Sequence, residues 1–325
     1  MIEIDGIFNI NKPTGMTSHD VVARVRRLLR GLSVHAGEAG ERTQSPRPGR
    51  QVRVGHAGTL DPMATGVLPV VVGRATRLVE YLADADKAYR ATLVLGATSD
   101  TYDREGTITP VANAVMPSLE EVRHALRKFT GEVEQLPPMY SAVRVGGKQL
   151  YEFARAGVEV ERKPRRVIIN DIRLEAYRPP MLRIYVECSK GTYIRTLAHD
   201  LGQALGTGAY LSELTRTRHG PFTIEDAVTL QDLEAAFQQG TWQEMLHPPQ
   251  YILSLRGWPA VTLTPEQAHD VSLGRPLKLP PPKDPAPTPI AASTPEGVLS
   301  AILYWDHERQ VWQPKKVFGP QPPPA

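Results

Sequence analysis

A single acidic residue stands in a stretch that is rich in glycine and proline. The stretch reads GHAGTLDPMATGVLP from Gly55 to Pro69, and Asp61 is its only acidic residue. Its three glycines and two prolines prescribe the path of the backbone. A carboxylate held in this way can attack a substrate or accept a proton when it is ionised. The alternative is an Asx turn, because Asp before Pro is common in turns, and the stretch alone leaves both interpretations open.

Arg195 is the second candidate because of its place on the predicted elements. Residues 182–188 alternate between apolar and polar side chains, which predicts a strand, and a turn at 189–191 leads into an amphipathic helix. Arg195 lies in the first turn of that helix, where the helix dipole disfavours a cation. An arginine that served only helix stability would not stand there, so its position favours a functional role.

Other catalytic chemistries have no matching motif in the chain. The nine histidines show no HExxH pattern or clustered ligand spacing. Asp100 and Asp103 lack the remaining ligands and the glycine of a calcium loop. The stretch around Asp61 fits no phosphate-binding loop, dinucleotide fingerprint or serine elbow, and no second acid is marked as an activator of water. We therefore expect no metal and no cofactor.

Aromatic and cationic side chains are interleaved in residues 131–166. Tyr140 lies in LPPMYSA at 136–142, Lys148 and Tyr151 follow, and RKPRR at 162–166 is a compact cationic run. This composition is typical of a surface that stacks on bases and binds phosphates. A proline-rich loop that packs its tyrosines inward explains the same residues equally well.

The elements around these residues mix strands and helices. Apolar residues at helical spacing predict a helix capped by Thr17 and Ser18, and its polar face carries four arginines, at positions 24, 26, 27 and 30. We interpret them as a solvated face, with RNA contact as the less favoured alternative. Ser118 and Thr229 begin two further predicted helices, and a helix is expected over 75–82. The predicted strands are 6–10, 70–72, 89–95, 167–169, 182–188 and 210–218, and a polar turn is expected over 98–106.

Composition limits the class of protein. The chain has 325 residues, of which 41% are hydrophobic and 22% are charged, as in ordinary globular proteins of one or two domains. The net charge is only +3, so nucleic-acid binding must depend on local basic faces. Cys188 is the one cysteine, which excludes an internal disulfide. No signal peptide or membrane-spanning run is visible, so we expect a cytoplasmic protein with no membrane contact.

Several blocks together resemble one enzyme family. They are the stretch around Asp61 with GRATR at 73–77, KAY at 87–89, LPPMYSA at 136–142 and GTYIRTL at 191–197. They occur in order across most of residues 6–220 and resemble the bacterial tRNA pseudouridine-55 synthase family, TruB. The resemblance implies an α+β fold whose mixed, largely antiparallel sheet, flanked by helices, surrounds the Asp61 cleft.

The resemblance also implies roles for individual residues. Asp61 would be the nucleophile, acting at the sugar carbon or by deprotonating the sugar, and Arg195 would hold it ionised through paired hydrogen bonds. Tyr89 is expected to stack on the target base and to move a proton late in the reaction. His56 is expected to hold the T-loop open once the base is flipped. The other expected contacts to substrate are Lys12, Tyr140, Lys148, Tyr151, Tyr193 and Leu214.

Two domains and one partner follow from the resemblance. A catalytic domain is expected over 1–247 and a PUA-like, β-barrel-like RNA-binding domain over 248–325. The expected partner is the T-arm of tRNA, bound by a monomer with no obligate protein partner. Three local features are also expected: a flexible insertion at 33–52, an RNA-gripping insertion at about 131–166, and a proline-rich loop at 280–295 before a disordered tail at 319–325.

Two alternatives to this function remain open. One is an RNA-binding folding factor in which catalysis is secondary. The other is the related guide-RNA-dependent synthase, which works inside a larger particle.

Overall fold

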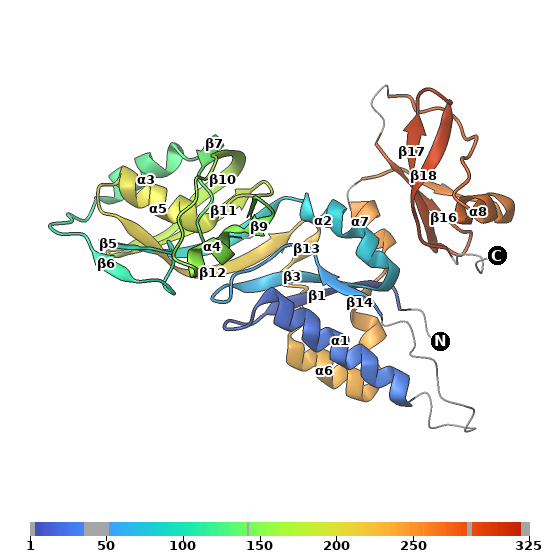
Figure 1. Cartoon of the computed structure of the whole chain (residues 1–325), viewed down its shortest axis with the longest axis horizontal. Helices are drawn as coiled ribbons and strands as arrows, with labels where there is room; N and C mark the ends of the chain where they lie inside the picture. The colour runs from blue at the N-terminus through green and yellow to red at the C-terminus, as the bar shows by residue number, and fades with distance from the viewer. Residues whose placement is uncertain (1–3, 36–51, 142, 256, 285–287, 320–325) are drawn as a thin grey trace.

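One large sheet forms the centre of the protein (Figure 1). The computed structural model describes residues 4–35, 52–141, 143–255, 257–284 and 288–319. Ten of the described strands belong to this sheet, and every pairing in it is antiparallel except the parallel contact of β12 with β3. The predicted mixed, largely antiparallel sheet is therefore confirmed. The strand order is β14 (Leu246–His247), β1 (Gly6–Lys12), β3 (Thr65–Val72), β12 (Ala209–His219), β4 (Lys87–Leu95), β11 (Met181–Cys188), β10 (Arg165–Arg178) and β7 (Gly131–Gln135), while β2 (Val54–His56) pairs with β3 and β13 (Phe222–Thr223) pairs with β12.

Two hydrophobic cores lie on opposite faces of the sheet. Strand β1 shows the division, because Phe8 and Ile10 belong to one core whereas Ile7 belongs to the other. The first core takes in the apolar faces of α1 (Ser18–His35), α3 (Leu119–Arg127), α5 (Ile194–Ala204) and α6 (Leu230–Gln239). The second core is covered by η1 (Gly73–Leu78), α2 (Val79–Ala83) and α7 (Gln250–Leu255).

A smaller sheet follows in the C-terminal part of the chain, as the sequence predicts. Its order is β15 (Ala260–Thr262), β16 (Ile290–Ser293), β17 (Leu299–Asp306) and β18 (Val311–Val317), and α8 (Pro265–Ser272) begins with a capping box at Thr264. This module packs on the second core. Its Tyr304 hydroxyl lies 3.1 Å from that of Tyr81, and its Lys316 pairs with Glu80 at 2.9 Å.

Most predicted elements are present, and the differences are local. The helix after Thr17 and the capping box at Ser118 are confirmed. Residues 75–82 form a 3-10 helix before the α-helix, and the predicted polar turn at 98–106 overlaps β5 (Ala97–Ser99), which pairs with β6 (Ile108–Pro110). Elements not predicted include β7, β8 (Arg144–Val145), β9 (Lys148–Gln149), α4 (Leu150–Arg155) and η2 (Trp242–Met245).

Several expectations concern residues outside the described ranges. The predicted insertion at 33–52 falls mostly on 36–51, which lie outside them. The same holds for residues 285–287 of the predicted proline-rich loop and for 320–325 of the predicted tail. In the described part of the chain, no helix combines the length and the apolar character needed to cross a membrane.

Gly66 lets β12 approach β3 closely, and this yields a stability prediction. Its φ is +100°, and a Cβ there would lie 2.2 Å from the carbonyl oxygen of Arg216. We expect Gly66→Ala to lower the free energy of unfolding in urea by about 1–3 kcal/mol or more, through strain and overpacking. Gly15→Ala is the matched control, because Gly15 also has a positive φ (+83°) but no atom within 4 Å of its Cβ position. Equal losses in the two variants would contradict a role for the close approach.

Candidate active site

Asp61 lies in the loop between β2 and β3, at the floor of a cleft of about 980 Å³. The loop is tied to the start of α1, because the Ser18 hydroxyl accepts from the Leu60 N–H at 2.8 Å and donates to the Leu60 carbonyl at 3.1 Å. The Asp61 side chain is 32% exposed, so its carboxylate is open to the cleft while the residue before it is buried. The acid predicted from sequence is therefore fixed and accessible.

Lys12 supports this loop from one side. Its fully buried ammonium donates to the carbonyl oxygens of Met16 at 2.6 Å, Pro13 at 2.9 Å and Pro62 at 3.2 Å. Three acceptors use the three donors of an ammonium group. In this structure Lys12 binds the backbone of the turn after β1 and of Pro62, which follows Asp61, and its substrate contact stays a prediction. Burial lowers the pKa of Lys12 to about 8, against the opposing effect of the Asp61 charge.

Arg216 supports the loop from the other side. Its guanidinium, in a residue only 1% exposed, donates to the carbonyl oxygens of Val67 at 2.7 Å, Gly58 at 3.1 Å and Thr59 at 3.4 Å. Arg216 lies in the strand predicted over 210–218, but the strand pattern did not identify it as a site residue. The guanidinium can be buried because the carbonyl oxygens satisfy its donors. An alternating strand pattern does not reveal these acceptors.

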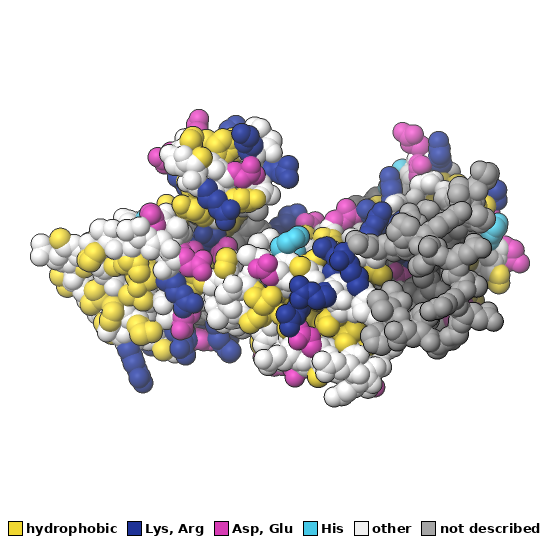
Figure 2. Space-filling model, turned by 60° about the horizontal axis from the view of Figure 1, so that its bottom comes forward, with side chains coloured by type: hydrophobic (Ala, Val, Ile, Leu, Met, Phe, Trp, Pro, Cys, Tyr) yellow, Lys and Arg dark blue, Asp and Glu magenta, His cyan; other side chains and the backbone are white. Residues whose placement is uncertain are grey.

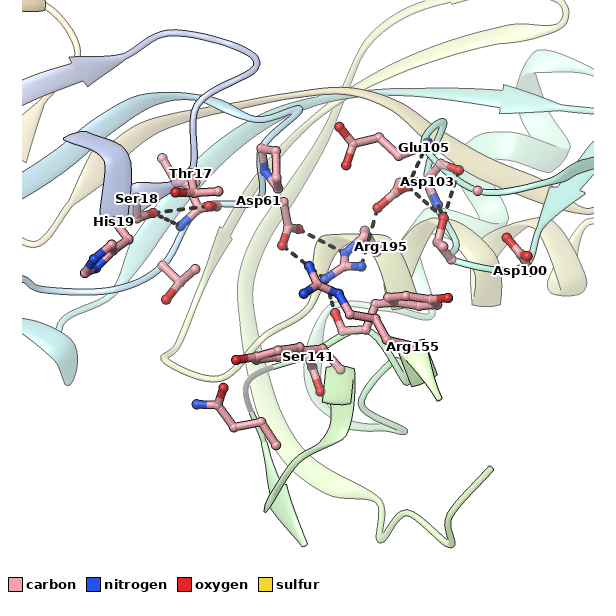
Figure 3. A pocket seen from close by; sticks show the side chains of 18 of the residues that line it. Thr17, Ser18, His19, Asp61, Asp100, Asp103, Glu105, Ser141, Arg155 and Arg195 are labelled. Atoms are coloured by element: carbon pink, nitrogen blue, oxygen red, sulfur yellow. Dashed lines mark hydrogen bonds and ion pairs between the residues drawn. The ribbon is translucent and has the colours of Figure 1, made fainter. Parts of the chain in front are cut away.

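Arg195 contacts both carboxylate oxygens of Asp61, through one ion-pair contact and one hydrogen bond (Figure 3). Its Nε lies 3.0 Å from Oδ2 and its Nη2 lies 3.2 Å from Oδ1. Arg195 is 5% exposed and occupies the first turn of α5, as predicted. A planar fork on a carboxylate fixes both the charge and the orientation of the acid.

A second acid, Asp103, completes the environment of Arg195. Its Oδ2 lies 3.4 Å from Nη1 of Arg195, and the carbonyl oxygen of Tyr140 accepts from Nη2 at 2.8 Å. Asp103 is buried, and it also accepts hydrogen bonds from Thr101 and from the N–H of Glu105. Sequence analysis considered Asp103 only as a metal ligand. No cluster of three metal-ligating side chains occurs among the described residues.

Opposing effects set the ionisation of Asp61. Burial raises its pKa above the usual aspartate value, the Arg195 charge opposes this, and the Asp103 charge adds to the rise. Lys12 and Arg216 also oppose it. The net direction is upward, so Asp61 takes up a proton at a higher pH than an exposed aspartate does.

Tyr89 lies behind the loop rather than on the lining of the cleft. It is 7% exposed, belongs to the first core and stands directly opposite Arg216 in the β4–β12 ladder. Burial raises the pKa of Tyr89 to about 12, although the Arg216 charge opposes this, and the phenol is protonated at neutral pH. A base that stacks on this ring must therefore displace some of its present neighbours.

The structure separates the other predicted contacts into two groups. His56, Tyr140 and Tyr151 line the cleft with Asp61 and Arg195. Burial, followed by the charge of Arg216, lowers the pKa of His56, which favours a neutral ring. The residues that lie elsewhere are the exposed Lys148 on β9, the half-buried Tyr193, which caps α5 with its backbone bonded to Gln135, and the buried Leu214 on β12.

Comparisons with known proteins identify the family of this chain. A family model described as TruB family pseudouridylate synthase (N terminal domain) matches residues 47–194, and one described as tRNA pseudouridylate synthase B C-terminal domain matches residues 195–254. Among solved structures, an H/ACA RNP bound to a substrate RNA containing 2′-deoxyuridine includes a chain with a TM-score of 0.68 and 26% identity. That match covers 97% of this chain and 86% of the other.

Two curated relatives are similar to this chain, and one of them matches nearly its whole length. The tRNA pseudouridine synthase B of Symbiobacterium thermophilum is 53% identical over 236 residues, which are 72% of each chain. The protein of the same name from Dehalococcoides mccartyi (strain CBDB1) is 42% identical over 320 residues, which are 98% of each chain. These matches, over a fold that holds Asp61 against Arg195, show that the chain belongs to the TruB family of pseudouridylate synthases.

Proposed function

We propose that this protein converts the T-loop uridine at position 55 of tRNA into pseudouridine, with Asp61 as the nucleophile after base flipping. The observation that carries the proposal is the bidentate pair of Arg195 and Asp61 at the floor of an open cleft. Membership of the TruB family and the names of the relatives, tRNA pseudouridine synthase B, support tRNA as the substrate.

The reaction is an isomerisation that neither adds nor removes atoms. The bond from C1′ to N1 breaks, the uracil turns, a bond from C1′ to C5 forms, and the hydrogen on C5 is replaced by one on N1. Asp61 would act by attacking C1′ or by removing a proton from the sugar, and both routes need the ionised acid. Arg195 keeps that form oriented, and the surrounding protein retains the detached base.

The cleft also has groups that suit a flipped nucleotide. Flipping costs a few kcal/mol of stacking, and each aromatic contact can return about 1–3 kcal/mol. His56, Tyr140 and Tyr151 line the cleft, and the guanidinium of Arg155 lies 5.3 Å from the ring centre of Tyr151. In this proposal the T-loop occupies the cleft and the C-terminal module is a PUA-like contact to the same RNA.

The likeness to a chain from an H/ACA RNP favours one rival, a synthase directed by a guide RNA. The TruB relatives are more similar, at 42% and 53% identity against 26%. We therefore propose that the chain acts alone on tRNA. A folding factor without catalysis is the other rival, and the oriented acid argues against it.

The direct test is position-resolved detection of pseudouridine in an unmodified tRNA transcript incubated with the purified chain. We expect product at position 55 with the wild type. Asp61→Asn should lower the rate at least about 10³-fold, because an amide of the same shape is not a nucleophile. Product at position 55 with Asp61→Asn would remove Asp61 from this role. Tight binding with no product from the wild type would instead support the guide-directed or folding-factor function.

Arg195→Lys should lower kcat by about 10²-fold, because an ammonium group cannot hold both carboxylate oxygens of Asp61 in the plane of a fork. Single-turnover kinetics at saturating tRNA give this rate, and a thermal unfolding scan controls for loss of structure. A folded variant with the wild-type rate would show that a positive charge beside Asp61 is enough for catalysis without the planar fork.

Asp103→Asn should move the acid limb of the pH–rate profile to lower pH. The sign follows from the charge of Asp103, which raises the pKa of Asp61, so its removal lowers that pKa. Activity requires ionised Asp61 and is lost as pH falls through its pKa. The rate on the plateau should fall as well, because Arg195 loses a partner. A limb that stays in place or moves to higher pH would contradict this electrostatic coupling.

A further inference from the structure

The arginines on α1 divide into two groups that the sequence alone does not separate. Arg24 forms an ion pair with Glu234 of α6, in which Nη2 lies 2.9 Å from Oε2. The charge of Arg27 also acts on Glu234, which places it toward the same side. Arg26 instead donates to the carbonyl oxygen of Val54 in β2, at 3.2 Å. The helix therefore carries one group of arginines toward α6 and another toward β2.

Helix geometry places Arg26 and Arg30 on the same side of α1 as His19, which lines the cleft. Positions 19, 26 and 30 fall within about 40° of one another at 100° per residue, and the last is about 16 Å along the axis from the first. His19 lines the cleft, so the row formed with Arg26 and Arg30 begins at the active site and leads away from it. Arg53 immediately precedes β2, beside the contact of Arg26 with Val54.

These residues form a row of basic side chains, which we call the α1–β2 track: His19, Arg26, Arg30 and Arg53. Arg30 and Arg53 are exposed, and neither has an ion pair among the described residues. Arg26 uses one of its five N–H donors for the Val54 carbonyl, which leaves the other donors available to a phosphate. The neighbouring acid Asp20 accepts from the N–H and hydroxyl of Thr17. Figure 2 shows Lys and Arg side chains gathered next to a histidine in the middle of the face that carries α1.

We propose that the α1–β2 track binds the phosphodiester backbone of the tRNA where it leaves the cleft. This inference rests on the proposed function, which puts the target uridine beside His19 and Asp61. Arginine forks bind phosphate oxygens in pairs, and a row of arginines that leads away from the site follows a strand better than a single charge does. The net charge of +3 makes such local rows necessary for RNA binding.

The test measures affinity for an unmodified tRNA transcript as a function of salt. In the wild type, log affinity falls linearly with log salt, with a slope of about −0.7 to −0.9 per phosphate neutralised. The triple variant Arg26→Gln, Arg30→Gln, Arg53→Gln should have a slope smaller by about 2 to 3, and its KM for tRNA should rise about tenfold or more. The double variant Arg30→Gln, Arg53→Gln leaves the contact of Arg26 with Val54 intact. Its slope should be smaller than the wild-type slope by about two thirds of the change in the triple variant.

Arg24→Gln is the matched control, because it removes the same charge from the same helix on the face that is paired with Glu234. Its slope and KM should equal those of the wild type. An unchanged slope in the double variant, or an equal change in Arg24→Gln, would overturn the track.

The assay separates this proposal from the proposed function. If the wild type forms no pseudouridine, the proposed function fails, whereas the salt slopes are still measured. If the wild type and the double variant form it with the same KM and slope, only the track fails. The KM and the slope would also be unchanged if the α1–β2 track bound an acidic protein instead of tRNA.

Discussion

The pairing of one guanidinium with two carboxylates is the interaction on which the site depends. Arg195 comes from α5, Asp61 from the loop before β3 and Asp103 from the turn after β5, so three distant segments meet at one group. Removing one partner of a buried charge leaves the others unpaired at a cost of several kcal/mol. The sheet must therefore hold these segments in register for the acid to stay ionised and aligned.

Lys12 and Arg216 are also buried charges, but their hydrogen-bond partners are backbone carbonyl oxygens rather than side chains. Each is buried, and the hydrogen bonds of both go mainly to carbonyl oxygens in or next to the Asp61 loop. A loop rich in glycine gains its shape from these two cations, and their charges oppose the effect of burial on Asp61. Oriented donors and charges that are in place before the substrate arrives need no rearrangement during the reaction, which is the physical basis of preorganisation.

Local patterns in the sequence were enough to predict the position of Arg195, which follows from the order of a strand, a turn and a helix. They were also enough to identify Asp61 as the one acid in a stretch rich in glycine and proline. They were not enough for Arg216 and Asp103. An arginine in a strand and an aspartate in a polar turn are usually exposed, and only the long-range contacts with the Asp61 loop and with Arg195 explain why these two are buried. The burial of Lys12 was not predicted for the same reason, since its acceptor Pro62 is fifty residues away.

Strand β3 connects the chemistry to the second module of the protein. Its first residue follows the Asp61 loop, and its last leads into η1 and α2, where Arg77 donates to the Val317 carbonyl and Tyr81 meets Tyr304. Eight residues of extended chain span about 26 Å. The GRATR block therefore acts in docking, and the same strand sets how far the C-terminal module stands from the acid. Under the proposed function, an RNA that reached both the cleft and the module would have to bridge this distance, which the sheet holds fixed.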